Sequence, residues 1–172
     1  MKKNFLIYIL SFAFLALTGC EGVKETSTPV SSEVNIYGKA PLFVLPDFEG
    51  DIVSLEDMIG KKIILLNFHT LNCPYCLTML PGLNELYENY KGEMEIVSVY
   101  IDESGPRLKS FVKKRDIRYY VLLDSKQQVA YQYGILGVPS LFVLDLEGEI
   151  RYLGHDSKKA EEVMKKLIDA AS

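Results

Sequence analysis

Beyond about residue 40 of this chain, apolar residues follow two patterns. They form short, nearly continuous runs, or they recur three or four positions apart. Short, nearly continuous apolar runs are typical of strands that are buried on both faces. A Pro- and Gly-containing turn at residues 46–50 separates the first two runs, and Glu147-Gly148 separates the last two, so each pair is expected to form a β-hairpin. The predicted strands cover residues 42–44, 51–53, 63–69, 95–101, 119–123, 140–144 and 150–153.

Between the strands, apolar residues recur three or four positions apart, which is the spacing of one buried helix face. Pro81 lies inside the clearest of these segments, and because it removes one backbone hydrogen bond it should bend that helix. A capping-box pattern at residues 54–57, which Gly60 follows, predicts one further helical turn. The longer predicted helices cover residues 74–90, 104–112, 125–133 and 160–168.

Strands that alternate with helices and end in an antiparallel hairpin imply an α/β fold, with a mixed sheet covered by helices. These elements span residues 41–172, and about 130 residues suit one compact domain with one core. The formal net charge is −4 with both signs interspersed, which leaves no basic stripe for nucleic acid. Lys113-Lys114-Arg115 is interpreted as a solvated helix face. We expect a monomer that does not bind nucleic acid.

The N-terminus has the features of an export signal. Lys2 and Lys3 precede an apolar run at residues 5–17, which is shorter than the roughly 20 residues needed to span a bilayer. Together with Leu17-Thr18-Gly19-Cys20, residues 1–19 resemble a bacterial lipoprotein signal peptide, which implies that Cys20 becomes the lipidated first residue of the mature protein. A plain cleaved signal with an incidental cysteine is the alternative. We expect an extracytoplasmic protein that is anchored by lipid to a bacterial membrane.

The segment that follows Cys20 is rich in Ser, Thr, Pro and Gly and shows no apolar period. Residues 20–40 are therefore interpreted as a lipidated N-terminus and a flexible tether, and residues 41–172 as the folded domain. A flexible segment of this length has a root-mean-square span of about 25 Å, which is enough to hold a small domain just off a membrane.

Cys73-Pro74-Tyr75-Cys76 places two thiols one helical turn apart, directly after the apolar strand at residues 63–69. A C-x-x-C that follows a strand and opens a helix is typical of thioredoxin-like redox sites. The helix N-terminus stabilises a thiolate, and Pro74 suits the first helical position, where no N–H is needed. We expect Cys73 to be the exposed, more acidic nucleophile and Cys76 to lie deeper and resolve the mixed disulfide.

Two other interpretations of this cysteine pair are weighed against the redox site. A C-x-x-C is also half of a zinc site, but the rest of the chain offers only Cys20, His69 and His155, whereas structural zinc usually takes four ligands in two short-spaced pairs. A purely structural disulfide would close a tight loop, and strained or exposed bridges tend to be the reactive ones. We therefore expect a redox-active pair and no metal.

Several motifs together resemble the thioredoxin-like proteins of the TlpA/ResA type, and the likeness runs from about Ala40 to the C-terminus. The resemblance implies a thioredoxin-like fold with a mixed central sheet flanked by helices, an N-terminal β-hairpin and a central strand-helix insertion between Tyr100 and Leu123. The motifs are residues 67–76, Pro81, Gly137-Val138-Pro139-Ser140 and residues 144–148.

The same resemblance implies a function. Members of the TlpA/ResA type are typically membrane-tethered, extracytoplasmic disulfide reductases, and some serve cytochrome c maturation. For this chain it implies exported protein disulfides as substrates, a membrane thiol-disulfide electron donor as partner, and no cofactor beyond the two thiols. Reduction is the expected direction, with oxidation or isomerisation as the alternative, because a shift of about 30 mV already changes the exchange equilibrium tenfold.

Val138-Pro139-Ser140 resembles the cis-proline loop of the family. A cis bond would turn the backbone of Val138 toward the dithiol, where a substrate segment could pair with it as an added strand. An ordinary proline at the start of a strand is the alternative. Tyr75 lies inside the dithiol motif, where it would tune substrate fit or redox potential, or simply be part of the surface. We expect Val138, Pro139 and Tyr75 to bind substrate.

The chain departs from the family pattern next to the dithiol. The tryptophans that usually lie one and four positions before the first cysteine are replaced by Asn72 and His69. Met79 stands where some reductive members carry Glu, and Asn67 stands where thioredoxin has a buried Asp. No obvious carboxylate base is left for Cys76. Water, the outgoing substrate thiolate and His69 are the candidates for accepting its proton, and the alternative for His69 is a hydrogen-bonded packing residue.

Other functions compete with a disulfide reductase. Thr70-Leu71-Asn72-Cys73 has the T-x-x-C spacing of peroxiredoxins, which suggests a thiol peroxidase, although Leu66 stands where their motif has a proline. A lipoprotein binding module that kept the fold without turnover is a second alternative. A glutathione-dependent, glutaredoxin-like role is suggested by the dithiol motif alone, but the extra elements and the export signal argue against it.

Overall fold

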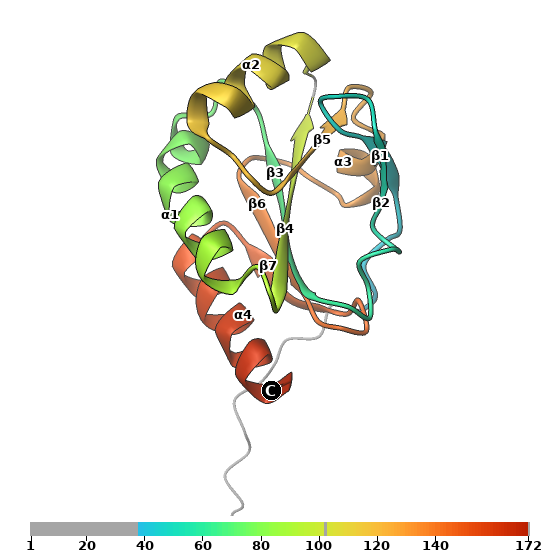
Figure 1. The fold of residues 1–172 in the computed structure, drawn as a ribbon. Helices are drawn as coiled ribbons and strands as arrows, with labels where there is room; N and C mark the ends of the chain where they lie inside the picture. Colours follow the sequence, from blue (N-terminus) through green and yellow to red (C-terminus); the bar gives the residue numbers. More distant parts are fainter. Residues whose placement is uncertain (1–37, 102, 172) are drawn as a thin grey trace, which may run out of the picture. The chain divides into compact units, whose positions relative to one another are not determined.

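The computed structural model describes residues 38–101 and 103–171, and its centre is a five-stranded sheet in the order β5-β4-β3-β6-β7 (Figure 1). The expected signal peptide, Cys20 and most of the expected tether lie outside the described residues. The elements are β1 (Val44–Pro46), β2 (Ile52–Ser54), β3 (Ile63–His69), α1 (Pro74–Tyr90), β4 (Met94–Ile101), α2 (Gly105–Arg115), β5 (Tyr120–Asp124), α3 (Gln128–Gln132), β6 (Ser140–Leu144), β7 (Ile150–Gly154) and α4 (Ser157–Ala171).

The central sheet is mixed, as the element order predicted. β3 pairs in parallel with β4, and β4 in parallel with β5. On its other side β3 pairs antiparallel with β6, and β6 pairs antiparallel with β7. The segment that follows β3 and the segment that precedes β6 therefore leave the sheet at the same end, because two antiparallel neighbours run in opposite directions.

Successive side chains of each strand point to opposite faces, so the sheet separates two apolar layers. One layer packs against α1, α2 and α4, and the other against the β1–β2 hairpin and α3 (Figure 1). Every residue of β3 is buried because both faces are covered. This strand is consequently a rigid support for the segment at its carboxyl end.

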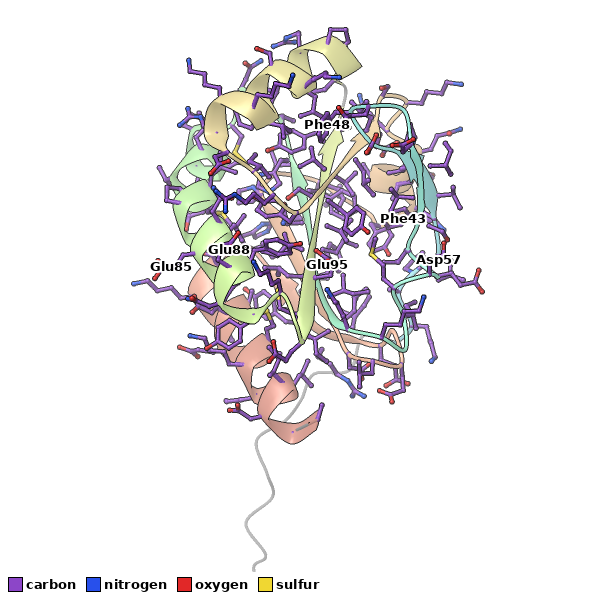
Figure 2. The ribbon with its side chains drawn as sticks, viewed as in Figure 1. Phe43, Phe48, Asp57, Glu85, Glu88 and Glu95 are labelled. Atoms are coloured by element: carbon purple, nitrogen blue, oxygen red, sulfur yellow. A yellow bond between two sulfur atoms is a disulfide. The ribbon has the colours of Figure 1, made fainter. Side chains whose placement is uncertain are left out.

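The N-terminal hairpin covers one edge of the central sheet. Asp47 forms an isolated antiparallel bridge with Leu122 of β5, which protects the outer strand on that side. Phe43 packs into the layer that contains α3, whereas Phe48 at the turn of the hairpin reaches the layer that contains α2 (Figure 2). The hairpin is therefore part of the domain core.

Three details of the predicted elements are wrong. The first strand is Val44–Pro46 instead of residues 42–44, because Pro46, which was expected in the turn, pairs with Ile52. The expected helical turn at residues 54–60 is a series of tight turns, with N–H groups of Met58 and Lys61 donating to carbonyls three residues earlier at 3.1 Å and 3.2 Å. The helix expected at residues 125–133 is limited to Gln128–Gln132, because Gln127 adopts a left-handed backbone with φ 57°. The prediction of a long helix with Pro81 inside it is confirmed.

Asp124 holds α3 against the end of β5. Its carboxylate is buried and accepts hydrogen bonds from the backbone N–H groups of Gln128 at 2.9 Å and Ala130 at 2.7 Å. These are N–H groups at the start of a helix, which have no partner within the helix itself. α3 leads directly into the segment before β6, so this carboxylate positions the start of that segment.

None of the helices among the described residues is both long enough and apolar enough to cross a membrane.

Replacing Asp124 with Ala should lower the free energy of unfolding by about 2–3 kcal/mol, because the buried N–H of Ala130 and the partly buried N–H of Gln128 lose their acceptor. Asp124→Asn keeps one acceptor oxygen and should give an intermediate loss of about 1 kcal/mol. Urea denaturation of the three proteins measures both values. Equal stability of Asp124→Ala and the wild type would show that α3 is held by its apolar contacts instead.

Candidate active site

Cys73 and Cys76 form a disulfide at the N-terminus of α1, with their Cα atoms 5.2 Å apart. Cys73 occupies the N-cap position in an extended conformation, and Pro74 follows in the first helical turn as expected. The backbone N–H of Cys76 donates to the Cys73 sulfur at 3.1 Å, which is the bond that an N-cap side chain normally accepts. Because the first turn of α1 contains no acidic residue, nothing there opposes a negative charge on this sulfur.

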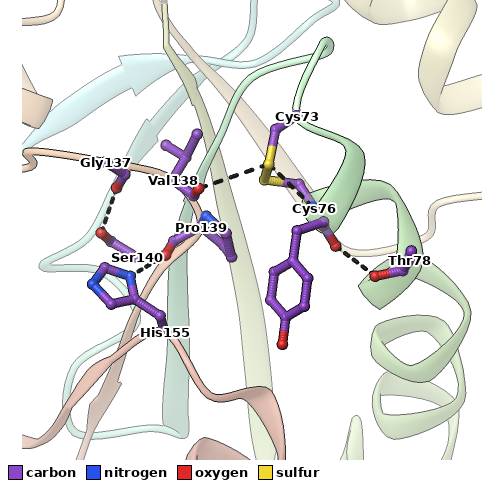
Figure 3. The surroundings of a disulfide bond; sticks show 9 residues. Cys73, Cys76, Thr78, Gly137, Val138, Pro139, Ser140 and His155 are labelled. Atoms are coloured by element: carbon purple, nitrogen blue, oxygen red, sulfur yellow. Dashed lines mark hydrogen bonds between the residues drawn. A yellow bond between two sulfur atoms is a disulfide. The ribbon is translucent and has the colours of Figure 1, made fainter.

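The two sulfurs differ in accessibility less than the sequence suggested. Cys76 is 2% exposed and Cys73 is 9% exposed, so Cys73 is the more accessible of the two, but it is not the open surface residue that we expected. The reason is the segment before β6, which lies next to it. The carbonyl oxygen of Val138 is 3.8 Å from the Cys73 sulfur (Figure 3).

The Val138–Pro139 peptide bond is cis, as the family resemblance implied. Pro139 is buried and Val138 is half-buried, and the Ser140 hydroxyl donates to the Gly137 carbonyl at 2.7 Å across the loop (Figure 3). The structure thus brings together residues that are far apart in the sequence, namely the dithiol and the Val138–Pro139 loop. This follows from the antiparallel pairing of β3 with β6, which places both segments at one end of the sheet.

Tyr75 lies on the first turn of α1 and is 55% exposed. Its backbone carbonyl accepts a hydrogen bond from the Thr78 hydroxyl at 2.7 Å, which closes that turn. A second exposed apolar side chain, Leu136, lies two residues before Val138. Sequence analysis did not single out Leu136, because exposure of an apolar residue is visible only once the chain is folded.

His69 is the last residue of β3 and is completely buried. Its ring stacks on Tyr100 with 5.3 Å between ring centroids, and neither ring nitrogen has a hydrogen-bond partner among the described residues. Burial lowers the pKa of His69 from 6.5 to about 3, because the charged imidazolium would lose its hydration. The imidazole is therefore neutral near pH 7, and it is not hydrogen-bonded as the packing alternative assumed.

Asn67 is completely buried on the same face of β3 as His69. Its side-chain oxygen accepts a hydrogen bond from the Ser98 hydroxyl at 2.9 Å, and its side-chain nitrogen has no partner among the described residues. Met79 is buried in the apolar layer under α1. The part of the chain that the structure describes contains no group of three or more His, Cys, Asp or Glu side chains that could hold a metal ion.

His155 was missed as a candidate by the sequence analysis. Its Nδ1 atom lies 2.5 Å from the carbonyl oxygen of Pro139 (Figure 3). The predicted hairpin of the last two strands was the feature of the sequence that could have indicated His155. In the structure Leu141 pairs with Gly154, and this pairing brings His155, the residue after β7, beside the Val138–Pro139 loop. That register depends on an irregularity between Val143 and Leu144, which the sequence does not reveal.

Comparison with known proteins identifies similar sequences over most of the chain. A family model described as the AhpC/TSA family matches residues 36–153. Thiol-disulfide oxidoreductase ResA from Bacillus cereus is 34% identical over 97% of this chain and 99% of its own length. The protein of the same name from Bacillus subtilis is 29% identical over 87% of this chain and 85% of its own.

A solved structure is similar as well. The crystal structure of a thiol:disulfide interchange protein of the thioredoxin family from Chlorobium tepidum has a TM-score of 0.65 at 25% identity, covering 76% of this chain and 96% of that one. The thioredoxin-like fold that the motifs implied is therefore confirmed.

Because His69 is neutral when folded and protonates at about pH 6.5 when unfolded, the unfolded state binds one more proton between pH 6.5 and pH 3. The contribution of His69 to the free energy of unfolding is fully present above pH 6.5. It decreases as the pH falls from 6.5 toward 3, by about 1.4 kcal/mol per pH unit. His69→Phe keeps an aromatic ring and should remove this part of the slope, which urea denaturation at several pH values measures. Tyr100→Phe is the control that retains the slope, and equal slopes for the wild type and His69→Phe would contradict the assignment.

Proposed function

The chain belongs to the AhpC/TSA family and is a thiol-disulfide oxidoreductase, and on this basis we propose that it reduces disulfide bonds in exported proteins through Cys73 and Cys76. The observation that supports the proposal best is the disulfide at the N-terminus of α1, next to the Val138 carbonyl. A bonded pair is the state that such an enzyme reaches after it has reduced a substrate.

In the first step the thiolate of Cys73 attacks one sulfur of a substrate disulfide. A bond forms between Cys73 and that sulfur, the substrate S–S bond breaks, and the other substrate sulfur leaves as a thiolate. The N–H of Cys76 and the positive end of the α1 dipole stabilise the charge on Cys73 before the attack. The position of Cys73 as N-cap is therefore the source of its reactivity.

In the second step Cys76 loses its proton and attacks the Cys73 sulfur. The Cys73–Cys76 bond forms, the mixed disulfide breaks, and the second substrate sulfur leaves as a thiolate, so that the substrate gains two electrons and the protein loses two. The departing substrate thiolate can accept the Cys76 proton. His69 can take part only as a neutral imidazole, because a group with a pKa of about 3 is a weak base at neutral pH.

Substrate binding is assigned to the surface around the dithiol. The exposed ring of Tyr75 provides an apolar contact on α1. The backbone of Val138 offers hydrogen-bonding groups to an extended substrate segment, which would pair with it as an added strand beside Pro139. Main-chain pairing selects for extended, accessible segments rather than for one sequence, so unfolded or flexible exported proteins are the substrate class.

The cellular location rests on the N-terminus. In this proposal residues 1–19 direct export, Cys20 carries the lipid anchor, and residues 20–40 tether a monomeric domain of residues 41–172 to a bacterial membrane, outside the cytoplasm. A membrane protein with a dithiol returns the Cys73–Cys76 pair to the reduced state. Cytochrome c maturation is the narrower version of the proposal, in which the substrate cysteines are those that later bind haem.

Cys73→Ser should abolish disulfide reduction, whereas Cys76→Ser should form a mixed disulfide that cannot resolve. Expression of Cys76→Ser in the source bacterium, followed by mass spectrometry of the trapped complexes, identifies the substrate. The double variant Cys73→Ser/Cys76→Ser is the matched control and should trap nothing.

Three results would argue against this function. Equal complexes in the single and double variants would mean that Cys73 does not attack a substrate. Consumption of hydrogen peroxide by the purified protein, without any trapped protein, would favour the thiol peroxidase. Substrate cysteines that accumulate as thiols, not as disulfides, in cells lacking the protein would mean that it oxidises them.

Cys20→Ser should remove the lipid-anchor site and release the protein from the membrane fraction, while the dithiol activity of the purified protein stays within about twofold of the wild type. Cell fractionation and incorporation of labelled palmitate measure the two effects. Retention of Cys20→Ser in the membrane fraction would contradict the anchor, although an uncleaved signal segment must first be excluded by N-terminal sequencing.

A further inference from the structure

We propose that His155 is a positioning residue that fixes the Val138–Pro139 loop for substrate pairing. The inference rests on the proposed function, since it concerns how that loop receives a substrate. The observation behind it is the 2.5 Å contact between His155 Nδ1 and the Pro139 carbonyl oxygen. Figure 3 shows the His155 ring on the side of the loop away from the disulfide.

His155 continues the β6–β7 ladder by one hydrogen bond. The last backbone pair of this ladder is Leu141 with Gly154, and in the same register Pro139 would face Asp156. The backbone N–H of Asp156 is not available to Pro139, because it donates to the Tyr152 hydroxyl at 3.1 Å. The imidazole of His155 supplies the missing donor and ties the Pro139 carbonyl to the sheet.

The turn that carries His155 is itself held in place. The Tyr152 hydroxyl accepts from the Asp156 N–H and donates to the Asp156 carbonyl at 3.1 Å, so the ring spans the turn. At Gly154 a Cβ atom would lie 2.5 Å from the Tyr152 hydroxyl oxygen, which leaves no room for a side chain there. Asp156 also accepts from the N–H of Lys158 at 2.9 Å in the first turn of α4. His155 thus stands on a rigid turn.

The contact determines which tautomer the histidine adopts. A carbonyl oxygen can only accept, so Nδ1 must carry the proton and the neutral ring has its lone pair on Nε2. The Pro139 carbonyl is then held on one side of the loop, and the Ser140 hydroxyl holds the Gly137 carbonyl on the other. Val138 lies between these two anchored groups, with its own carbonyl toward Cys73.

An anchored loop lowers the entropy lost when a substrate strand pairs with Val138. Loss of the His155 bond should therefore weaken binding of polypeptide substrates and leave the exchange chemistry of the two sulfurs intact. A net hydrogen bond of ordinary strength corresponds to about a three- to tenfold change in an equilibrium constant. The expected effect is a rise of that size in KM for a polypeptide disulfide, with kcat and the reaction with a small disulfide unchanged.

Asn and Leu form a matched pair of substitutions at this position. Asn places an amide N–H as many bonds from the backbone as Nδ1 of histidine, whereas Leu has the same branched shape without a donor. Full-length wild type, His155→Asn and His155→Leu are compared for reduction of insulin with dithiothreitol as the reductant. The same proteins, reduced beforehand and freed of dithiothreitol, are compared for the rate of their stoichiometric reaction with 5,5′-dithiobis(2-nitrobenzoate). We expect His155→Leu to raise KM for insulin only, and His155→Asn to restore it. Nitrogen-15 NMR of the wild type should show the proton on Nδ1.

Any result other than the expected one contradicts either the inference or the proposed function on which it rests. Insulin KM values that are the same in all three proteins, or that rise equally in both variants, would overturn the role of the His155 donor. A slower reaction with the small disulfide in His155→Leu would mean that the residue acts on the sulfurs. An Nδ1 atom that carries no proton would contradict the bond to Pro139. Failure of the wild type to reduce either disulfide would instead count against the proposed function, and the NMR result would still test the bond.

Discussion

The placement of β3 at the centre of the sheet, buried on both faces, is the constraint on which the active site depends. A strand that is covered by helices on one side and by the hairpin and α3 on the other cannot shift, so its carboxyl end is a fixed point. α1 starts a few residues beyond that point, and the antiparallel neighbour β6 starts beside it. The N-terminus of a helix and the Val138–Pro139 loop therefore meet at one place, where a sulfur can be both stabilised as an anion and offered to a substrate.

The polar side chains buried at the end of β3 are an amide and an imidazole, which distinguishes this site from one that has a carboxylate base. Asn67 and His69 lie on one face of β3, and both are completely buried. An amide cannot lose a proton near neutral pH, and the imidazole is kept neutral because its charged form would be desolvated. These two side chains at the end of β3 are thus neutral, and the backbone of α1 stabilises the charge on Cys73.

The prediction from sequence was best where one local pattern decides the structure. The spacing of apolar residues, Pro at the first helical position and Cys at the cap define α1 without reference to the rest of the chain, and its bounds were predicted correctly. β3 and β6 were equally well predicted, because fully apolar runs have few alternatives. The short helix α3 was predicted too long, since its start depends on a left-handed Gln127 and on a carboxylate from the preceding strand. The spacing of apolar residues reveals neither of these two features.

The sequence alone determined the dithiol, the helix that carries it, the class of fold and the family, since each depends on residues that are adjacent or regularly spaced. Tertiary structure alone decided how far Cys73 is covered, that His69 is buried with no hydrogen-bond partner in the described part of the chain, and that His155 reaches Pro139. These depend on strand register and on which surfaces are brought together. Both result from the packing of the whole chain, because burial is a property of a residue's neighbours in space, and most of these neighbours are distant in sequence.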